Sequence, residues 1–175
     1  MANRLPGRLD EAVNDFSLAI HTKDDYSRPY SNRGTIYLAQ GQLDRASEDF
    51  SKAIELDLHF ADAYSNRGGV EHQMGRDEAA LKDLDPALRL NPNSADAYQN
   101  RGVVKNVFKL FPEALADFNQ ALKLNPGKNN GAIHLGRGIS KFYLGGKTGA
   151  CEDWRTASAR SAINAAELII EYCKE

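Results

Sequence analysis

Small and large apolar positions recur along this 175-residue chain at a fixed spacing of 34 residues, separated by polar and charged positions. The recurring positions are Gly34, Gly68 and Gly102; Ala46, Ala80 and Ala114; Phe50, Leu84 and Phe118; and Ala53, Ala87 and Ala121. A fourth copy, at Gly138, Ala150, Trp154 and Ala157, follows after 36 residues. Self-similarity at a period of this length indicates a repeat architecture.

Each repeat is predicted to form two helices joined by a short turn. Turn signals such as Gln40-Gly41-Gln42 lie in the middle of the repeats. Asn91-Pro92 and Asn125-Pro126 end the second helices, because proline cannot continue a helix. Pro86 lies inside a second helix, and we expect it to kink or shorten that helix. A single helix pair cannot bury its apolar face, so the predicted fold is an all-α solenoid of stacked antiparallel helix pairs.

At these positions the sequence resembles the tetratricopeptide repeat (TPR) family. The glycine, the two alanines, the large residue between them and the terminal proline match the family pattern over roughly residues 7–160. The resemblance implies one domain over residues 1–175, a TPR superhelix with a C-terminal capping helix. The predicted segments are a half repeat or cap at 7–26, full repeats at 27–60, 61–94 and 95–130, a divergent repeat at 131–161 and the capping helix at 162–175. A first helix for the half repeat would lie before Met1 or within the first six residues.

An arginine and an aspartate recur together, 16 residues apart, in every complete repeat. The pairs are Arg33 with Asp49, Arg67 with Asp83, Arg101 with Asp117, and Arg137 with Asp153. In a hairpin that turns near Gly41, Arg33 and Asp49 are equidistant from the turn and therefore lie at the same height. We expect bidentate ion pairs that lock each hairpin, which would make these residues structural. The alternative is a row of ligand-binding arginines.

An asparagine precedes three of these arginines, at Asn32, Asn66 and Asn100. The period places them in a row on the first helices, which line the concave surface in the TPR family. A side-chain amide both donates and accepts hydrogen bonds, so such a row can hold the main chain of an extended peptide, as it does in some members of the family. The alternative is that each asparagine bonds within its own repeat or faces water. The row stops at Gly136.

Other side chains are predicted to line the same concave groove. These further candidates for peptide binding are Arg28, Thr35, Asp62, Ser65, His72, Gln99, Asn106 and Phe142. Phe142 belongs to an apolar patch that would equally pack beneath the C-terminal helix. TPR domains that grip chaperone C-terminal carboxylates use lysines, whereas Ser31, Ser65 and Gln99 stand where such a lysine is expected. We therefore do not expect that kind of clamp.

Composition and charge narrow the classes of function. A net charge of −2 argues against an electrostatic nucleic-acid or anionic-membrane binder, and no apolar run is long enough to span a bilayer. We expect no metal ion and no cofactor, because the four histidines lack ligand spacing and Gly146-Lys147-Thr148 lacks the first glycine of a phosphate loop. No catalytic constellation is recognisable, so the protein is not expected to be an enzyme.

The two cysteines, Cys151 and Cys173, bear on the cellular compartment. The default expectation is a free buried pair in a cytoplasmic protein. If the final helix folds back, the two approach each other, and a disulfide would imply an oxidising compartment, periplasmic or secreted, after removal of a signal peptide.

These observations indicate a non-catalytic protein–protein interaction scaffold that binds an extended peptide or partner segment, of unknown identity, in its concave groove. One alternative is a structural, self-assembling segment that forms a homodimer through the open N-terminal face around Phe16 and Leu18. Another is a targeting domain of a larger protein. Fold alone does not decide among them, because function lies in the residues of a site.

Overall fold

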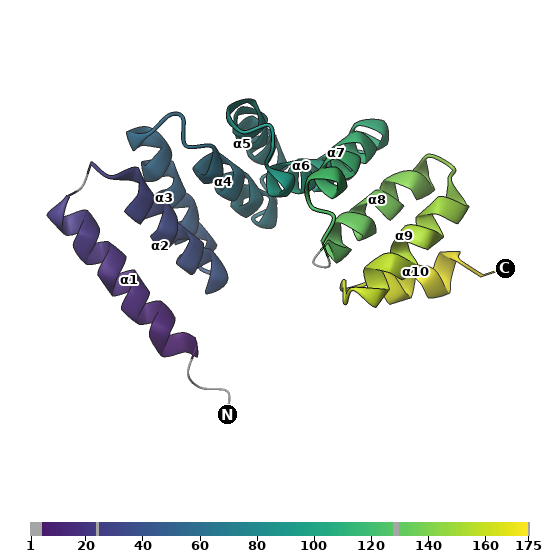
Figure 1. Ribbon diagram of the computed structural model, residues 1–175, viewed down its shortest axis with the longest axis horizontal. Coiled ribbons are helices and arrows are strands. Elements are labelled where there is room, and N and C mark those ends of the chain that lie inside the picture. Colours follow the sequence, from purple (N-terminus) through teal and green to yellow (C-terminus); the bar gives the residue numbers. More distant parts are fainter. Residues whose placement is uncertain (1–4, 24, 128–129, 175) are drawn as a thin grey trace. The chain divides into compact units, whose positions relative to one another are not determined.

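A computed structural model of the chain describes residues 5–23, 25–127 and 130–174. These residues form ten helices and no strand, which confirms the predicted all-α class (Figure 1). The helices are α1 (Leu5–Thr22), α2 (Ser27–Ala39), α3 (Leu43–Leu56), α4 (Ala61–Gln73), α5 (Asp77–Leu90), α6 (Ala95–Val107), α7 (Phe111–Leu124), α8 (Gly131–Tyr143), α9 (Lys147–Ala159) and α10 (Ala165–Tyr172). None of them is long and apolar enough to cross a membrane, within the residues described.

The chain divides into two compact units, Met1–Pro92 and Asn93–Glu175. In unit 1, α2 pairs with α3 and α4 with α5, while α1 packs on α2 and α3 packs on α4. In unit 2, α6 pairs with α7 and α8 with α9, while α7 packs on α8 and α10 packs on α9. The stacked helix pairs confirm the predicted solenoid within each unit. That both units form one continuous domain stays a prediction.

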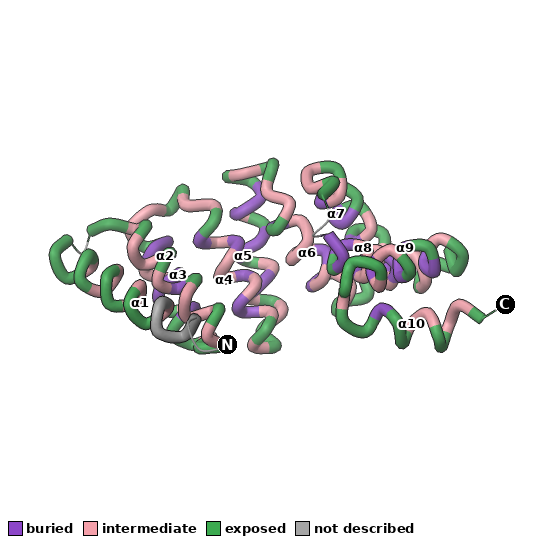
Figure 2. Tube along the Cα trace, turned by 60° about the horizontal axis from the view of Figure 1, so that its bottom comes forward, coloured by how far each residue is buried: buried purple, intermediate pink, exposed green. Residues whose placement is uncertain are grey.

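The recurring small residues let the two helices of a pair approach each other closely. A Cβ atom added at Gly34 would lie 3.0 Å from the ring of Phe50, so the side chain of Phe50 occupies the space that glycine leaves. The alanines and large residues of the repeat pattern are almost fully buried: Ala46, Phe50, Ala53, Ala80, Leu84, Ala87, Ala114, Phe118, Ala121, Ala150, Trp154 and Ala157. Figure 2 shows these buried positions (purple) spaced along the paired helices, with exposed positions (green) at turns and along much of α1 and α10.

Two expectations about individual helices are corrected in part. Helix α5 runs without interruption from Asp77 to Leu90 and has the same 14 residues as α3 and α7, so Pro86 does not shorten it. A proline removes only its own N–H from the ladder, and the remaining hydrogen bonds and buried contacts keep the helix intact. At the N-terminus, α1 already begins at Leu5, so no separate first helix occupies residues 5–6. Residues 1–4 lie outside the described part.

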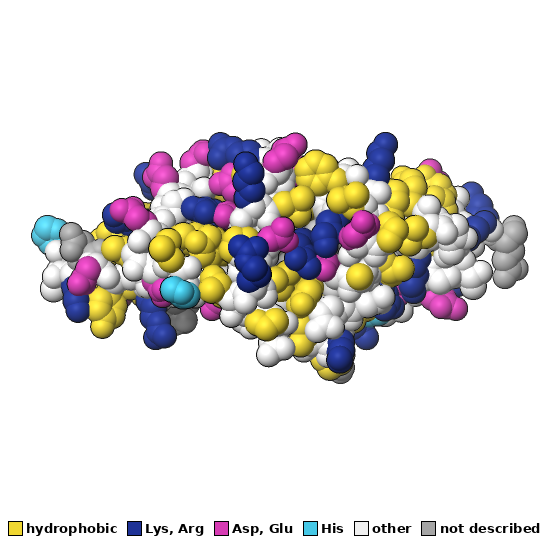
Figure 3. All heavy atoms as spheres, turned by 90° about the horizontal axis from the view of Figure 1, so that it is seen from above, with side chains coloured by type: hydrophobic (Ala, Val, Ile, Leu, Met, Phe, Trp, Pro, Cys, Tyr) yellow, Lys and Arg dark blue, Asp and Glu magenta, His cyan; other side chains and the backbone are white. Residues whose placement is uncertain are grey.

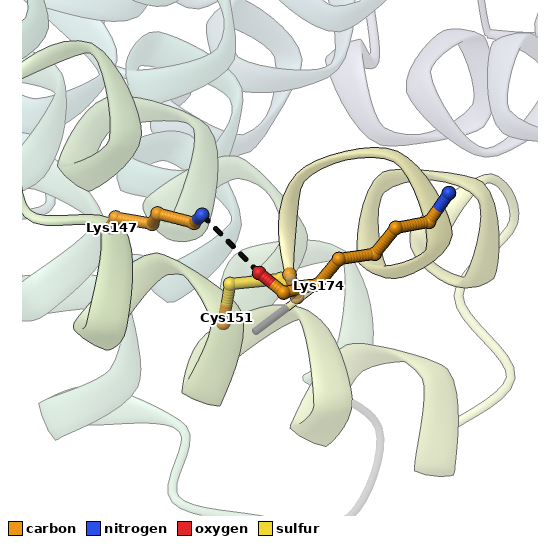
Figure 4. Close-up of a disulfide and its surroundings, with 4 residues drawn as sticks. Lys147, Cys151 and Lys174 are labelled. Carbon is orange, nitrogen blue, oxygen red and sulfur yellow. Dashed lines mark hydrogen bonds between the residues drawn. A yellow bond between two sulfur atoms is a disulfide. The ribbon is translucent and has the colours of Figure 1, made fainter.

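The C-terminal helix is shorter than predicted and is covalently attached. Helix α10 covers eight residues of the 162–175 segment. Cys151 at the start of α9 and Cys173 just beyond α10 form a disulfide, with sulfur atoms 2.03 Å apart (Figure 4). The default expectation of a free cysteine pair was therefore wrong. The final helix does fold back onto α9, which brings the two sulfur atoms together.

Candidate functional site

All four predicted arginine–aspartate pairs are present as two-point contacts. In each pair Nε and Nη2 of the arginine donate to the two carboxylate oxygens at 2.6–2.9 Å. The aspartates are only 3–6% exposed. The hydrogen bond to Asp49 raises the pKa of Arg33 above its ordinary value, and Asp83 does the same for Arg67, although burial opposes both shifts. These contacts join the two helices of one hairpin, so the arginines serve the fold.

Arg33, Arg67 and Arg137 also reach the helix that precedes their own, a contact that the sequence analysis did not predict. Arg33 and Arg67 each donate from Nη1 to a serine hydroxyl, Ser17 at 2.9 Å and Ser51 at 3.0 Å. Arg137 donates likewise to the side-chain oxygen of Asn119 at 3.0 Å. The sequence contains a pattern that could have predicted this contact, because the three acceptors occupy the same position of the repeat: Ser17 and Ser51 are one repeat apart, and Asn119 lies two repeats further on. The contact ties successive repeats together.

The first-helix position that carries Tyr37 in one repeat carries Glu71, Lys105 and Lys141 in the others. Each of these charged side chains has a polar partner within the protein. Glu71 is 7% exposed and accepts a 2.6 Å hydrogen bond from the hydroxyl of Ser47. Lys105 and Lys141 each reach the aspartate of their own hairpin, at 2.7 Å and 2.8 Å. These side chains therefore add to the internal ion-pair network in place of an aromatic contact.

Asp153 contacts more basic side chains than the aspartates of the other three arginine–aspartate pairs. Besides Arg137, it is contacted by Lys141 and by Nδ1 of His134, which lies 3.0 Å away. Burial works against its ionisation, but hydrogen bonds from Arg137, Lys141 and His134 hold the pKa of Asp153 below its ordinary value. The carboxylate is thus ionised at neutral pH and is the electrostatic centre of the last helix pair.

The three asparagines of the predicted ladder are not used by the fold. Asn32 on α2 is exposed, and Asn66 on α4 and Asn100 on α6 are half-buried. Among the described residues, none of the three side-chain amides makes a hydrogen bond. Asn32 and Asn66 belong to unit 1 and Asn100 belongs to unit 2. Their amides therefore remain available to a ligand, and bonding within their own repeats is not observed.

The other candidates divide into side chains that are available and side chains that are engaged. Arg28 and Asp62 are exposed, Gln99 is half-buried, and Thr35 is exposed while its hydroxyl donates to the carbonyl of Ser31. Ser65 is buried, and Nδ1 of His72 lies 2.5 Å from the carboxylate of Asp77. Asn106 donates to the carbonyl of Gly136 and accepts from Ser140. Phe142 packs between Trp154 and Tyr172, beneath α10.

A groove of about 390 Å³ lies between α6 and α8 in unit 2. It is lined by Val103, Asn106, Val107, Ala132, Leu135, Gly136 and Ile139. Six of these seven residues are apolar or glycine, and the amide of Asn106 bridges the two helices by its bonds to Gly136 and Ser140. Asn100 precedes Val103 and Val107 on α6 by three and seven residues, so it lies on the same face of that helix. An open amide and an apolar groove are thus side by side.

A larger hollow, of about 650 Å³, lies at the turns of unit 1. Its charged side chains pair with neighbours: Arg76 lies 3.4 Å from Glu71 and 3.9 Å from Asp44, and Arg45 donates to Gln42. On the surface seen in Figure 3, basic and acidic side chains likewise lie next to one another.

No group of three or more His, Cys, Asp and Glu side chains in the described residues has a geometry that could hold a metal ion. The α6–α8 groove is therefore the stronger candidate.

Residues 34–75 and 68–105 match the family model described as TPR repeat. This part of the chain consists of tetratricopeptide repeats. No curated protein sequence matches it significantly.

Solved structures with the same fold include several TPR proteins. MamA is 21% identical, with a TM-score of 0.74 over 93% of this chain and 94% of MamA. YrrB, described as a TPR protein with an unusual peptide-binding site, is 20% identical, with a TM-score of 0.70 over 92% of this chain and 83% of YrrB. The first TPR domain of Spaghetti (RPAP3), bound to the HSP90 peptide SRMEEVD, is 25% identical, with a TM-score of 0.62 over 67% of this chain and 93% of that domain.

Proposed function

We propose that this TPR protein is a non-catalytic protein–protein interaction scaffold that binds an extended segment of a partner. The observation that carries the proposal is the α6–α8 groove of unit 2, an apolar hollow beside the unbonded amide of Asn100. YrrB, which has this fold, is described as a TPR protein with an unusual peptide-binding site. The Spaghetti domain, which also has this fold, is a TPR domain with a bound peptide. They support the class of function and leave the partner of this chain to be found.

The groove is suited to an apolar side chain on an otherwise extended segment. Packed helices stand roughly 10 Å apart, and an extended strand rises roughly 3.3 Å per residue. One such segment therefore presents about every third residue to successive first helices. An apolar side chain would enter between Val103 and Leu135, while Asn100 holds the main chain through both of its hydrogen-bonding functions.

The partner segment at this groove is expected to differ from an acidic chaperone tail. The Spaghetti domain binds the peptide SRMEEVD, which contains three acidic residues. The α6–α8 groove has no basic side chain in its lining, and Gln99 stands on α6 where a clamp lysine is expected. An unpaired carboxylate would lose its hydration there without gaining a cation, which disfavours acidic segments.

A displayed random-peptide library provides the test. Peptides selected on the wild-type protein are titrated calorimetrically against Val107→Asp, which places a charge on the groove wall, and against Ile163→Asp as a control. Both residues are exposed, at 52% and 82%, so neither change disturbs the core. We expect Val107→Asp to weaken binding at least about tenfold, or about 1.4 kcal/mol, and Ile163→Asp to leave it unchanged. Equal loss in both variants would place the peptide outside the groove.

The same series separates the asparagines from the groove. Asn100→Ala should weaken the selected peptide by about 1 kcal/mol, the net value of a typical hydrogen bond. Replacement of Asn32 and Asn66 in unit 1 weakens it only if the peptide extends onto that unit. Circular dichroism melting curves should be unchanged in the asparagine variants, because none of the three amides makes a hydrogen bond among the described residues.

We also infer an oxidising compartment, periplasmic or extracellular, as the place where the protein works. Disulfides persist in such compartments and are rare in the cytosol, and the Cys151–Cys173 bond supports this alternative over the cytoplasmic one. Alkylation of free thiols before cell lysis tests it. Full alkylation of both cysteines would contradict the inference.

A further inference from the structure

Helix α10 is held in place by a small apolar contact and by the disulfide. Its residues Leu168, Ile169 and Tyr172 pack on the cluster around Trp154 and Phe142. Tyr172 is the closest aromatic partner, with its ring centroid 4.7 Å from that of Phe142. A helix of eight residues does not persist alone in water, because nucleation costs more than so few hydrogen bonds return. The position of α10 therefore depends on these attachments.

The turn that joins α9 to α10 contains unfavourable backbone conformations. Ser161 and Asn164 both have positive φ values, of 59° and 67°, although neither is glycine. Such conformations cost free energy for residues with a Cβ atom and persist only where the surrounding structure enforces them. At Ser161 the constraint is the cap of α9, in which the N–H of Ala162 donates to the carbonyl of Ala157 and that of Ser161 to the carbonyl of Ser158, both at 3.0 Å. Asn164 lies beyond this cap and directly precedes α10, so it is the point at which the turn can extend if α10 is released.

The disulfide fastens the end of α10 that lies away from this turn. Cys151 is 5% exposed, whereas Cys173 is partly exposed beyond the last turn of α10. In Figure 4 the neighbouring Lys174 carbonyl accepts a 3.5 Å hydrogen bond from Nζ of Lys147. Of the two cysteines, Cys173 is therefore the more exposed to a reductant.

We propose that α10 is an exchangeable arm, and that opening of the disulfide lets the face beneath it bind α10 of a second copy of this chain. A thiolate of a dithiol reductant attacks Sγ of Cys173, and the buried Cys151 leaves as a thiolate and takes up a proton. The second thiol of the reductant then displaces Cys173, which is protonated in turn. The reductant loses two electrons and two protons as its own disulfide forms, and the two cysteines gain them.

The occupant of the uncovered face follows from the contacts already present. The face around Trp154 and Phe142 is complementary to α10, so α10 of another copy restores every contact that the release removes. Exchange of an identical element between copies is a low-cost route to a dimer, and a strained hinge favours it. Extension of the turn at Asn164 removes its positive φ value and leaves the cap of α9 at Ser161 in place. This inference does not depend on the proposed peptide groove.

Two complementary variants test the exchange. Cys151→Ser retains the cysteine on the arm, and Cys173→Ser retains the cysteine on the face, so neither chain can close its own disulfide. When the two are mixed and mildly oxidised, an exchanged arm places Cys173 of one copy beside Cys151 of the other. We expect a disulfide-linked dimer in the mixture, and peptide mass spectrometry should identify a 151–173 link between chains. Each variant alone cannot form that link and serves as the control.

The links formed when Cys151→Ser and Cys173→Ser are mixed show whether the arm exchanges. If the mixture yields only links between like cysteines, or no covalent dimer, the exchange does not occur. Release itself is measured on the wild-type protein, which contains one tryptophan, Trp154, at 1% exposure beneath the arm. Reduction should increase the quenching of Trp154 by acrylamide and accelerate amide exchange in α10 about a hundredfold, the effect of opening a loop of this size. Unchanged quenching and exchange would show that α10 stays closed without the disulfide and would overturn the proposal.

Discussion

Asp153→Asn is expected to lower the free energy of unfolding of unit 2 by about 3–5 kcal/mol, the cost of removing one partner from a buried ion pair. The carboxylate of Asp153 has a side-chain exposure of 4% and receives Arg137 through two hydrogen bonds and Lys141 at 2.8 Å. Asparagine keeps the shape but removes the negative charge. Two mostly buried cations, with side-chain exposures of 20% and 27%, then face each other across a neutral amide.

The measurement is urea unfolding followed by the fluorescence of Trp154, which lies in unit 2 and is the single tryptophan of the chain. Glu152→Gln is the matched control, because Glu152 is the exposed neighbour of Asp153 on the same helix. That control should change the free energy by no more than about 0.5 kcal/mol. A loss of the same size in both variants would contradict a specific role for Asp153.

The effect of Asp153→Asn should depend on pH in a defined direction. The pKa of Asp153 is lowered in the folded protein, so the stabilisation is fully present above the pKa of the unfolded state, about 3.9. It is lost as the pH falls through the lower pKa of the folded state. The difference between wild type and variant should therefore be constant from neutral pH down to about 5 and shrink below about 4. A difference that grows in acid would contradict this assignment.

Gly136→Ala is expected to lower the free energy of unfolding of unit 2 by about 1–3 kcal/mol, the typical cost of overpacking a core. A Cβ atom at this position would overlap Cζ of Phe118, which is itself fully buried. The ring cannot move without disturbing the packing of α7 on α8. The carbonyl of Gly136 also accepts from Asn106 and Ser140, so displacement of α8 would strain both bonds.

Gly149→Ala is the matched control for this second prediction. Gly149 lies in the first turns of α9, and a Cβ atom there would meet only the side chain of Lys141, at an ordinary 3.4 Å. Alanine is the better helix former by up to about 1 kcal/mol, so the control should be neutral or stabilising. The same tryptophan-detected urea titration measures both variants. If Gly136→Ala were as stable as wild type, the close approach of α8 to Phe118 would not be required.

Gly136 also explains why the asparagine row ends. In the period of the chain it occupies the position of Asn32, Asn66 and Asn100, and a side chain there would collide with Phe118. The sequence shows that the row stops but not why. The reason is a contact between α8 and the preceding helix pair, which depends on the side-chain packing of two different repeats.

Features that repeat with the period were predictable, and features that occur once were not. The hairpins and the Arg–Asp spacing follow from counting residues, because each copy of the repeat forms the same helix pair with the same contacts. The roles of Lys105 and Lys141 require the position of an aspartate on the partner helix. The disulfide required the path of the final turn, which no earlier repeat supplies. The groove depends on the apolar residues at positions where earlier repeats carry polar ones, such as Val103 in place of Thr35.

The most direct test of the scaffold function is the location of a bound peptide on the protein. Amide hydrogen exchange is measured for the wild-type protein with and without a saturating peptide from the random library. The proposal predicts slower exchange in the first helices α6 and α8, which line the groove, and little change in the second helices α7 and α9. Protection confined to α7 and α9, or to α10, would contradict binding in the groove.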